Sequence, residues 1–257
     1  MARVAPGRPS YTETDRSMRR SLPQCLGALV IFASLVGAPA QAASSLADEL
    51  SRAAPTANPK VLQLAARAAE CARRQGLLEG FNHLAVIDYS LPSTQPRLWV
   101  FDVSRGRLMF QELVAHGRNT GDGLAERFSN VEGSKMSSIG LYQTAETYYG
   151  SNGYSLRLRG LDPGFNDNAL SRAIVMHGAP YVSQAIADRL GRIGRSWGCP
   201  AVRQEVARTV IDTLKGGALL FAYYPDRNWL SGSPFFKCGD EPAKQLAAAT
   251  PAGAHSG

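Results

Sequence analysis

The sequence predicts a mainly β domain with a few helices, an α+β fold. Short runs of β-branched and aromatic residues recur between residues 82 and 225. Helical periodicity is confined to a segment before residue 80 and to two windows late in the chain. At 257 residues, with 44% hydrophobic and 19% charged residues, the composition is that of one globular domain with short extensions.

The first 42 residues have the pattern of an export signal. A basic start at Arg19-Arg20 precedes an apolar run (25–36), which the small-x-small sequence Ala40-Gln41-Ala42 follows. The apolar run is shorter than a membrane span requires. We therefore expect residues 1–42 to be a signal peptide, with Met18 as an alternative start, and no stable membrane span after cleavage. An uncleaved N-terminal anchor is the competing interpretation.

Export changes the interpretation of the cysteines. Once Cys25 leaves with the signal, Cys71, Cys199 and Cys238 remain, an odd number for an oxidising compartment. The simplest partition is one disulfide and one free thiol. Because Cys71 and Cys238 flank the core segment, they can pair and leave Cys199 free. The alternative is that all three are reduced or buried.

Residues 43–79 form an N-terminal helical segment in this interpretation. A short helix is predicted within 44–58, and a second over 59–76, which has apolar residues at helical spacing, Pro59 near its start and Gly76 at its end. The second helix is too short to be an independent domain. We expect it to brace the main domain, residues 80–236, and we expect residues 237–257 to be a disordered tail.

The main domain begins with a predicted antiparallel meander and continues with strands and helices in mixed order. The glycine- and polar-rich stretch 117–138 is too long for a simple turn, which indicates a functional loop. The predicted strands are 82–90, 97–104, 108–117, 155–160, 173–178 and 218–225, and the predicted helices are 181–191 and 203–217.

Charge and histidine placement exclude some classes of function. The net charge is +7, but five arginines lie within residues 1–42, so the remainder is only mildly basic. That balance suits an acidic polymer or peptide carboxylates, and there is no basic run interleaved with aromatics to indicate nucleic acid. His83, His116 and His177 are dispersed, so neither a metal site nor a cofactor is predicted.

The segment GRIGRSWGCPAV (191–202) holds two candidate nucleophiles. Gly194-Arg195-Ser196-Trp197-Gly198 matches the G-x-S-x-G pattern of a serine elbow. An elbow requires a preceding strand and a histidine later in the chain. Here a helical window precedes the pattern, and the only later histidine is His255 in the tail. We therefore reject a serine hydrolase.

Cys199 is the better candidate because a base is available. His177 ends a predicted strand 22 residues upstream, and a Cys–His pair can exist as thiolate and imidazolium, each stabilising the other. Gly198 allows close approach of a ligand, and the amides of Trp197, Gly198 and Cys199 are candidate oxyanion donors. The alternative is that Cys199 and His177 are structural residues without a catalytic role.

The sequence IVMHG, followed at this distance by RSWGCPAV, resembles the L,D-transpeptidase catalytic domain family of YkuD-like fold. VAHGRNTGDG and YYPDRNWL extend the resemblance to its murein branch, which has proline after the cysteine, over roughly residues 80–235. The resemblance implies a β-sandwich or barrel with the N-terminal helix as a brace. It also implies a periplasmic enzyme that acts on peptidoglycan stem peptides, with carbapenem-type compounds as inhibitors.

The resemblance implies a role for each residue of the motif. Cys199 would attack the carbonyl of the diaminopimelate L-centre in a donor stem, D-alanine would leave, and a thioester would form. His177 would take the thiol proton. Ser196 would align the histidine through its backbone carbonyl, and Gly198 with Trp197 or Cys199 would supply the oxyanion amides.

One departure from the family pattern leaves the acceptor open. The family often has an arginine two positions after the cysteine, where this sequence has Ala201. The acceptor is therefore a diaminopimelate amine (3-3 link), an L-alanine amine (1-3 link), a lipoprotein lysine or water. A carboxypeptidase or amidase and a non-catalytic wall-binding protein are the alternative functions. Candidate substrate-binding residues are His116, Arg118, Asn119, Asn166, Asn168, Arg172, Gly178 and Arg203.

Overall fold

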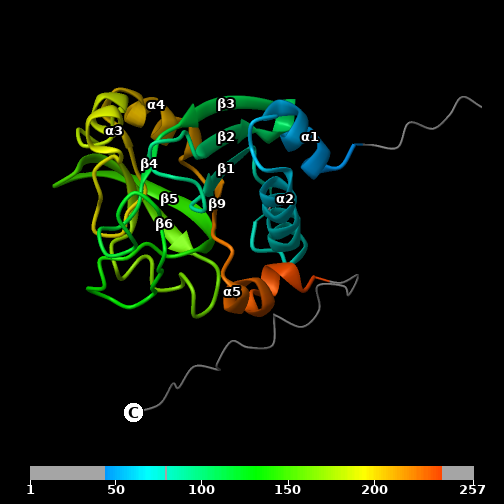
Figure 1. Ribbon diagram of the computed structural model, residues 1–257. Coiled ribbons are helices and arrows are strands. Elements are labelled where there is room, and N and C mark those ends of the chain that lie inside the picture. The colour runs from blue at the N-terminus through cyan, green and yellow to red at the C-terminus, as the bar shows by residue number, and fades with distance from the viewer. Residues whose placement is uncertain (1–43, 79, 239–257) are drawn as a thin grey trace, which may run out of the picture. The chain divides into compact units, whose positions relative to one another are not determined.

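Nine strands form one sheet in the order β3-β2-β1-β9-β5-β6-β7-β8-β4, and helices cover both of its faces (Figure 1). The structure is a computed structural model, and it describes residues 44–78 and 80–238. The strands are β1 (His83–Asp88), β2 (Leu98–Asp102), β3 (Arg107–Glu112), β4 (Val114–Ala115), β5 (Gly140–Gly150), β6 (Gly153–Gly160), β7 (Val175–Ala179), β8 (Ala201–Arg203) and β9 (Leu219–Tyr223). The helices are α1 (Leu46–Ala53), α2 (Pro59–Arg74), α3 (Gln184–Leu190), α4 (Gln204–Leu214) and α5 (Arg227–Gly232), with 3-10 turns at Val103–Arg105 and Pro234–Phe236.

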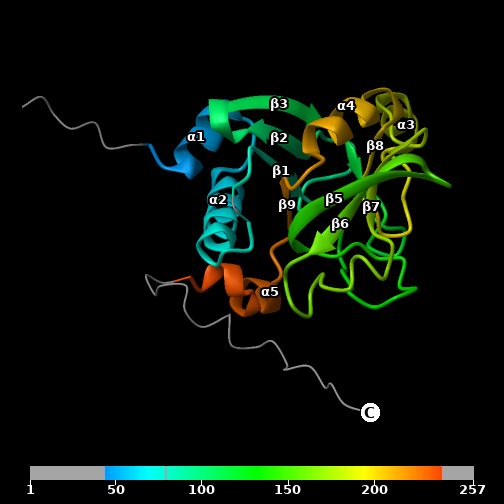
Figure 2. The ribbon, with the colours of Figure 1, turned by 180° about the vertical axis from the view of Figure 1, so that it is seen from behind.

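Chain connectivity forces the sheet to curl. Strands β3 and β4 stand at opposite ends of the strand order, yet only Leu113 separates them in sequence. Because one residue spans less than about 4 Å, both ends of the sheet must come together, and the sheet is nearly closed (Figure 2). The closure brings β4, β7 and β8 together at one side, where the cysteine motif lies.

The central strands are buried on both faces. In β1, Leu84 and Val86 point into one core cluster, while Ala85 and Ile87 point into a second. Strand β9 alternates between the two clusters in the same way and runs parallel to β1. Burial on both faces explains why LLFAY, the whole of β9, is a continuous apolar run.

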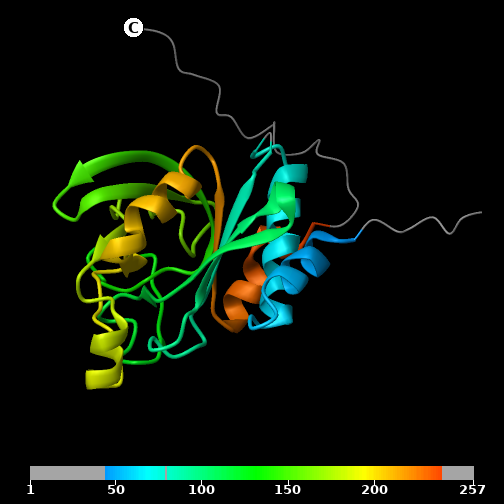
Figure 3. The same cartoon turned by 90° about the horizontal axis from the view of Figure 1, so that it is seen from above.

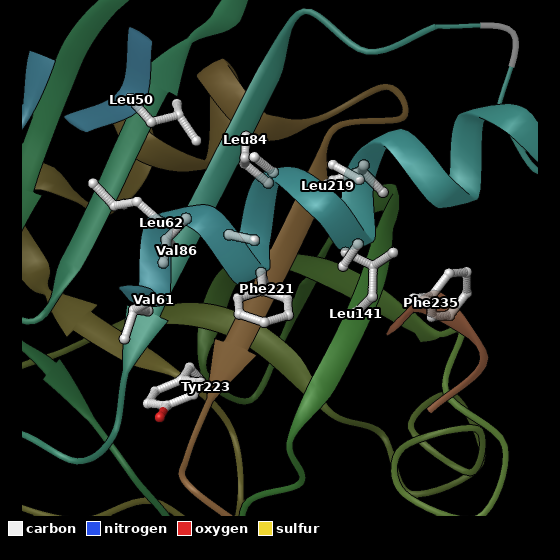
Figure 4. Close-up of a cluster of buried hydrophobic side chains, with 14 of the residues drawn as sticks. Leu50, Val61, Leu62, Leu84, Val86, Leu141, Leu219, Phe221, Tyr223 and Phe235 are labelled. Atoms are coloured by element: carbon white, nitrogen blue, oxygen red, sulfur yellow. The ribbon is translucent and has the colours of Figure 1, made fainter. Parts of the chain in front are cut away.

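Helices α1, α2 and α5 cover one face of the sheet, and α4 covers the other (Figure 3). Asn58 caps α2 and Pro59 occupies its first turn, as the sequence predicts. Its buried side is mostly alanine, so the helix lies close to the sheet, and Val61 and Leu62 fill the core against Phe221 (Figure 4). The predicted fold class, including the bracing helix, is confirmed.

A disulfide joins the end of α2 to the C-terminal segment. Cys71 and Cys238 are bonded with a Cα–Cα distance of 5.7 Å, and Cys199 is the free cysteine of the described residues. Arg67 also donates to the carbonyl of Phe236. Residues 237–238, which the sequence assigns to the tail, follow the Pro234–Phe236 turn, and Cys238 forms the disulfide.

Most predicted elements form within a few residues of their expected bounds, including the β1-β2-β3 meander. Three elements were not predicted. Strand β5 has a polar, partly exposed face and a bulge between Thr144 and Thr147, β8 has three residues, and α5 is a single short helix. The predicted signal peptide and most of the predicted tail lie outside the described residues. Among the described helices, none is both long and apolar enough to cross a membrane.

Replacing both cysteines of the disulfide should lower the free energy of unfolding. For Cys71→Ala with Cys238→Ala we expect a loss of about 2–5 kcal/mol, because the bond constrains residues 167 apart in the unfolded chain. Urea unfolding measures the loss. Cys199→Ala is the matched control and should change the free energy of unfolding by about 1 kcal/mol or less. Equal stability of the double variant and wild type would contradict the prediction.

Candidate active site

The loop before β8 is shaped by its serine hydroxyl. Ser196 Oγ donates to the carbonyl of Cys199 at 2.6 Å and accepts from the amide of Gly198 at 3.1 Å. Gly198 has a φ of 128°, and a Cβ there would stand 2.7 Å from the carbonyl oxygen of Met136. Only glycine fits that position. The turn that presents the Cys199 side chain is therefore fixed locally by Ser196, Gly198 and Cys199.

Two further loops hold this turn from the other side. The amide of Ser196 donates to His116 O at 3.0 Å, and the amide of Arg118 donates to Ser196 O at 2.8 Å, which makes a short parallel bridge. Ser137 Oγ accepts from the amide of Gly117 and donates to Gly198 O, both at 3.0 Å. The stretch 117–138, predicted to be a functional loop, thus packs directly on the nucleophile turn.

His177 is placed by the parallel pairing of β7 with β8. It lies opposite Ala201, two residues after the cysteine. Its Nδ1 is 2.9 Å from Gly178 O, so Nδ1 carries the proton of the neutral ring and Nε2 keeps a lone pair. Gly178 lets α4 pack close, because a Cβ there would meet Ala207 Cβ at 2.7 Å.

Cys199 and His177 open into one cavity of about 380 Å³. Tyr181 lines one wall, and Ser151 and Asn152, at the tip of the β5–β6 hairpin, line another. Arg195, Ser196 and the 70% exposed Trp197 complete the lining. A thiol and an unprotonated imidazole nitrogen on the same cavity are the components that nucleophilic catalysis requires.

Burial favours the neutral forms of both groups at rest. It raises the pKa of the Cys199 thiol, and a backbone bond to Val175 and the positive charge of Arg172 oppose that rise. It also lowers the pKa of His177, against the opposing bond to Gly178 O. Both shifts favour a thiol and a neutral imidazole, which can accept the thiol proton, over the thiolate–imidazolium pair that the sequence allows.

The structure corrects the roles predicted for Ser196 and Gly198. The Ser196 carbonyl accepts from Arg118 and does not reach the histidine, which its own neighbour Gly178 orients. The Gly198 amide is occupied by Ser196 Oγ. Within the described residues, no hydrogen bond engages the amides of Trp197 or Cys199, so these two are the available oxyanion donors.

Most of the predicted substrate-binding residues are engaged in the structure. Arg203 forms a two-bond salt bridge with Glu112, at 2.7 and 2.8 Å. His116 is buried and bonded through both ring nitrogens. Asn119, Asn166, Asn168 and Arg172 hold backbone or side-chain groups of neighbouring loops, and Gly178 is a packing position. Local hydrogen bonds or packing thus engage all seven residues, although Asn119 and Asn168 remain exposed, and their role in substrate binding stays a prediction.

Arg118 is the exception. Its backbone is bonded to the motif through Ser196 O, and its side chain is exposed. Its guanidinium makes no hydrogen bond or ion pair with any described residue. Among the predicted substrate-binding cations, it is therefore the one whose guanidinium is not engaged by another described residue.

Arg97 was missed at the sequence level. It is fully buried and donates to Leu91 O, to Val114 O and, at 2.8 Å, to His116 Nδ1. Because arginine only donates, His116 Nδ1 must accept, and Nε2–H then points to Gly121 O at 3.3 Å. Burial, with the Arg97 charge, lowers the pKa of His116 to about 4. Arg97 thus holds His116, whose backbone carbonyl accepts from the Ser196 amide. No local sequence signal indicates this role of Arg97.

His, Cys, Asp and Glu side chains form no group of three that could hold a metal ion in residues 44–78 and 80–238. Cys199 and His177 on one cavity, with backbone donors beside the sulfur, form a site of the cysteine-nucleophile class. The family model for the L,D-transpeptidase catalytic domain matches residues 53–223, about two thirds of the chain, and includes α2 as well as both of these residues. The chain belongs to the L,D-transpeptidase catalytic domain family, and this match confirms the predicted enzyme class.

Solved structures give weaker matches. An L,D-transpeptidase from Mycobacterium tuberculosis H37Rv is 17% identical, with a TM-score of 0.34 over 56% of this chain and 59% of that chain. L,D-transpeptidase 3 from the same species, with a faropenem-derived adduct, is 16% identical, with a TM-score of 0.34 over 56% and 61%. The cell shape determining protein Pgp2 of Campylobacter jejuni is 12% identical, with a TM-score of 0.35 over 63% and 57%. This chain therefore spans less than two thirds of their lengths, and no curated protein matches it.

Removing the Ser196 hydroxyl should reduce activity through the cysteine turn. Ser196→Ala deletes the bonds to Cys199 O and Gly198 N, so we expect about a tenfold lower kcat/KM and a loss of about 1–3 kcal/mol in stability. Ser196→Thr keeps the hydroxyl and is the control. If Ser196 acted only through its carbonyl, both variants would match wild type in steady-state kinetics.

Stability should fall as the pH drops from about 6.5 to about 4 because of His116. Its pKa in the folded chain is lowered to about 4, so between these values the unfolded chain binds a proton that the folded chain does not. The loss approaches about 3 kcal/mol for this group. In urea unfolding at several pH values, His116→Asn should flatten the dependence by that amount. Parallel pH profiles of the variant and wild type would refute the assignment.

Proposed function

We propose that this chain is an exported peptidoglycan L,D-transpeptidase that uses Cys199 as nucleophile and His177 as base. The observation that carries the proposal is the family match over residues 53–223, which includes both residues, together with their position on one cavity. Stem peptides of peptidoglycan are the substrates of the proposed reaction. The cavity of about 380 Å³ that both residues line is the proposed binding site for the donor stem.

The first half-reaction is an acyl transfer to sulfur. His177 Nε2 accepts the thiol proton as the sulfur attacks the carbonyl of the diaminopimelate L-centre. The carbonyl oxygen becomes an oxyanion, to which the amides of Trp197 and Cys199 would donate, since no backbone hydrogen bond engages them among the described residues. When the tetrahedral intermediate collapses, the C–N bond to D-alanine breaks, and its amine leaves with the proton held by His177.

The second half-reaction transfers the acyl group to an amine. The incoming amine attacks the thioester, His177 removes its proton, and the sulfur leaves as the new amide forms. The reaction needs no ATP, since the acyl group passes from one amide to another through the thioester. The acceptor is the diaminopimelate side-chain amine, giving 3-3 links, or the L-alanine amine, giving 1-3 links.

Arg118 is the proposed partner of a substrate carboxylate. Arg203 and Arg172 are held by protein groups, whereas the Arg118 guanidinium is exposed and its backbone is tied to Ser196. Stem peptides carry free carboxylates, and arginine binds a carboxylate through two parallel bonds. This interaction would orient the donor stem relative to the sulfur.

Export to the periplasm is part of the proposal. The signal pattern of residues 1–42 supports it, and the Cys71–Cys238 disulfide is suited to an oxidising compartment. Carbapenem-type β-lactams are proposed as inhibitors, because an activated amide carbonyl that enters the same cavity would acylate the same sulfur.

The purified full chain should convert tetrapeptide muropeptides into cross-linked dimers with release of D-alanine. Cys199→Ala should form no dimer, and Arg118→Ala should raise KM by about tenfold with a smaller change in kcat, since it removes a charged contact. Mass spectrometry of the products gives the acceptor. A tripeptide without dimer would instead assign a carboxypeptidase, and no product from wild type would contradict the enzymatic proposal.

A further inference from the structure

Arg172 is bound to a single neighbouring segment by four hydrogen bonds. Its guanidinium donates to Ser129 O at 2.7 Å, to Ser134 Oγ at 3.1 Å, to Met136 O at 2.7 Å and to Ser138 Oγ. All four acceptors lie within residues 129–138. One side chain therefore gathers a ten-residue segment that has no regular secondary structure of its own.

The gathered segment is the one that packs on the cysteine turn. Met136 O occupies the space that a Cβ on Gly198 would need, at 2.7 Å, and Ser137 Oγ donates to Gly198 O at 3.0 Å. Arg172 thus reaches the backbone before Cys199 through one hydrogen bond, to Met136 O, and one close packing contact, between Met136 O and Gly198. A change in the guanidinium would reach Gly198 through Met136.

The backbone after Arg172 approaches the sulfur directly. Ala173 O lies 3.7 Å from Cys199 Sγ. Ala173 adopts a φ of 52°, a left-handed conformation that a non-glycine residue holds only where its surroundings enforce it. Bonds from Ala173 N to Leu170 O and from Ile174 N to Ala169 O enforce the bend. The turn therefore carries Arg172 past the thiol.

The charge of Arg172 is not neutralised by a carboxylate. Its four acceptors are carbonyls and hydroxyls, and no described Asp or Glu forms an ion pair with it. The other titratable groups around Cys199 are His177, Tyr181 and Arg195, which line the same cavity, and the buried Tyr89. Burial raises the pKa of each of these tyrosines to about 12, so they stay neutral near pH 7. The charge of Arg195 is paired with Asp122 at 3.0 Å, which leaves Arg172 as the nearby cation that no described carboxylate neutralises.

We propose that Arg172 is a positioning residue for Cys199, which holds segment 129–138 against Gly198 and whose positive charge, unpaired with any described carboxylate, favours the thiolate form of the neighbouring cysteine. The inference rests on the proposed role of Cys199 as the nucleophile. Burial alone raises the pKa of the thiol, and the Arg172 charge works against that effect. Negative charge that develops on sulfur during attack is stabilised in the same way.

The test separates charge from loop anchoring with three variants of the full chain. Arg172→Gln removes the charge, Arg172→Lys keeps it but loses the fork of donors, and Ser134→Ala removes one acceptor without changing charge. Iodoacetamide alkylation of Cys199 is followed against pH by mass spectrometry of the tryptic peptide 196–203, so Cys25 does not interfere. Circular dichroism checks that each variant is folded.

Arg172→Gln should slow alkylation about tenfold at pH 7 and move the midpoint of its pH profile up by about one pH unit. Arg172→Lys and Ser134→Ala should keep the wild-type midpoint and lose about threefold to tenfold in kcat/KM for cross-linking. An unchanged midpoint in Arg172→Gln overturns the proposal. If that variant does not fold, a raised midpoint in Arg172→Lys or in Ser134→Ala overturns it. Alkylation requires only a thiolate, so its result stands even if the muropeptide assay gives no product.

Discussion

The close approach of three backbone segments at Gly198 is the constraint on which the site depends. Met136 O lies where a Cβ on Gly198 would be, and a Cβ on Gly117 would stand 2.6 Å from Lys135 O and 3.0 Å from Gly198 Cα. Ser137 Oγ links the two glycines by bonding to both. No side chain can be inserted at this junction, so the peptide that leads to Cys199 has little freedom. A nucleophile held in this way loses little further entropy when the substrate binds.

The nearly closed sheet supplies the segments that meet there. Strand β8 pairs with β7 on one side and with β4 on the other, which brings His177 in the middle of β7, Cys199 just before β8 and the chain after Ala115 to the same place. The two-sided burial of β1 and β9 fixes the middle of the sheet, and α2 with its disulfide closes the outer face. The bracing helix therefore acts on the site only through the sheet.

The sequence is sufficient to predict the strands with regular apolar patterns, because a fully apolar run such as LLFAY indicates burial on both faces. It also nominates Cys199 and His177 from short motifs, and the structure places both on one cavity. Strand β5 was missed because its outer face is polar and its register shifts at a bulge. The hydrogen-bond partners of the candidate substrate-binding residues could not be predicted for a different reason. Arg203 looks free in sequence because its partner, Glu112, is 91 residues away.

The roles of other polar loop residues also could not be predicted, because they depend on contacts that only the fold shows. His116 and Arg97 look like ordinary loop and strand-end residues, and only the fold reveals that they form a buried pair. Ser196 was assigned to the histidine through its carbonyl, whereas its hydroxyl closes the cysteine turn. Side-chain bonds to backbone within a turn depend on dihedral angles that sequence patterns do not specify.

The most direct measurement is the mass of tryptic peptide 196–203 after brief incubation of the full chain with a tetrapeptide donor and an acid quench. The account predicts a peptide heavier by the donor acyl group, with one D-alanine released per adduct and no adduct in Cys199→Ala. Cross-linked product that forms without any adduct on this peptide, or an adduct on another residue, would contradict it.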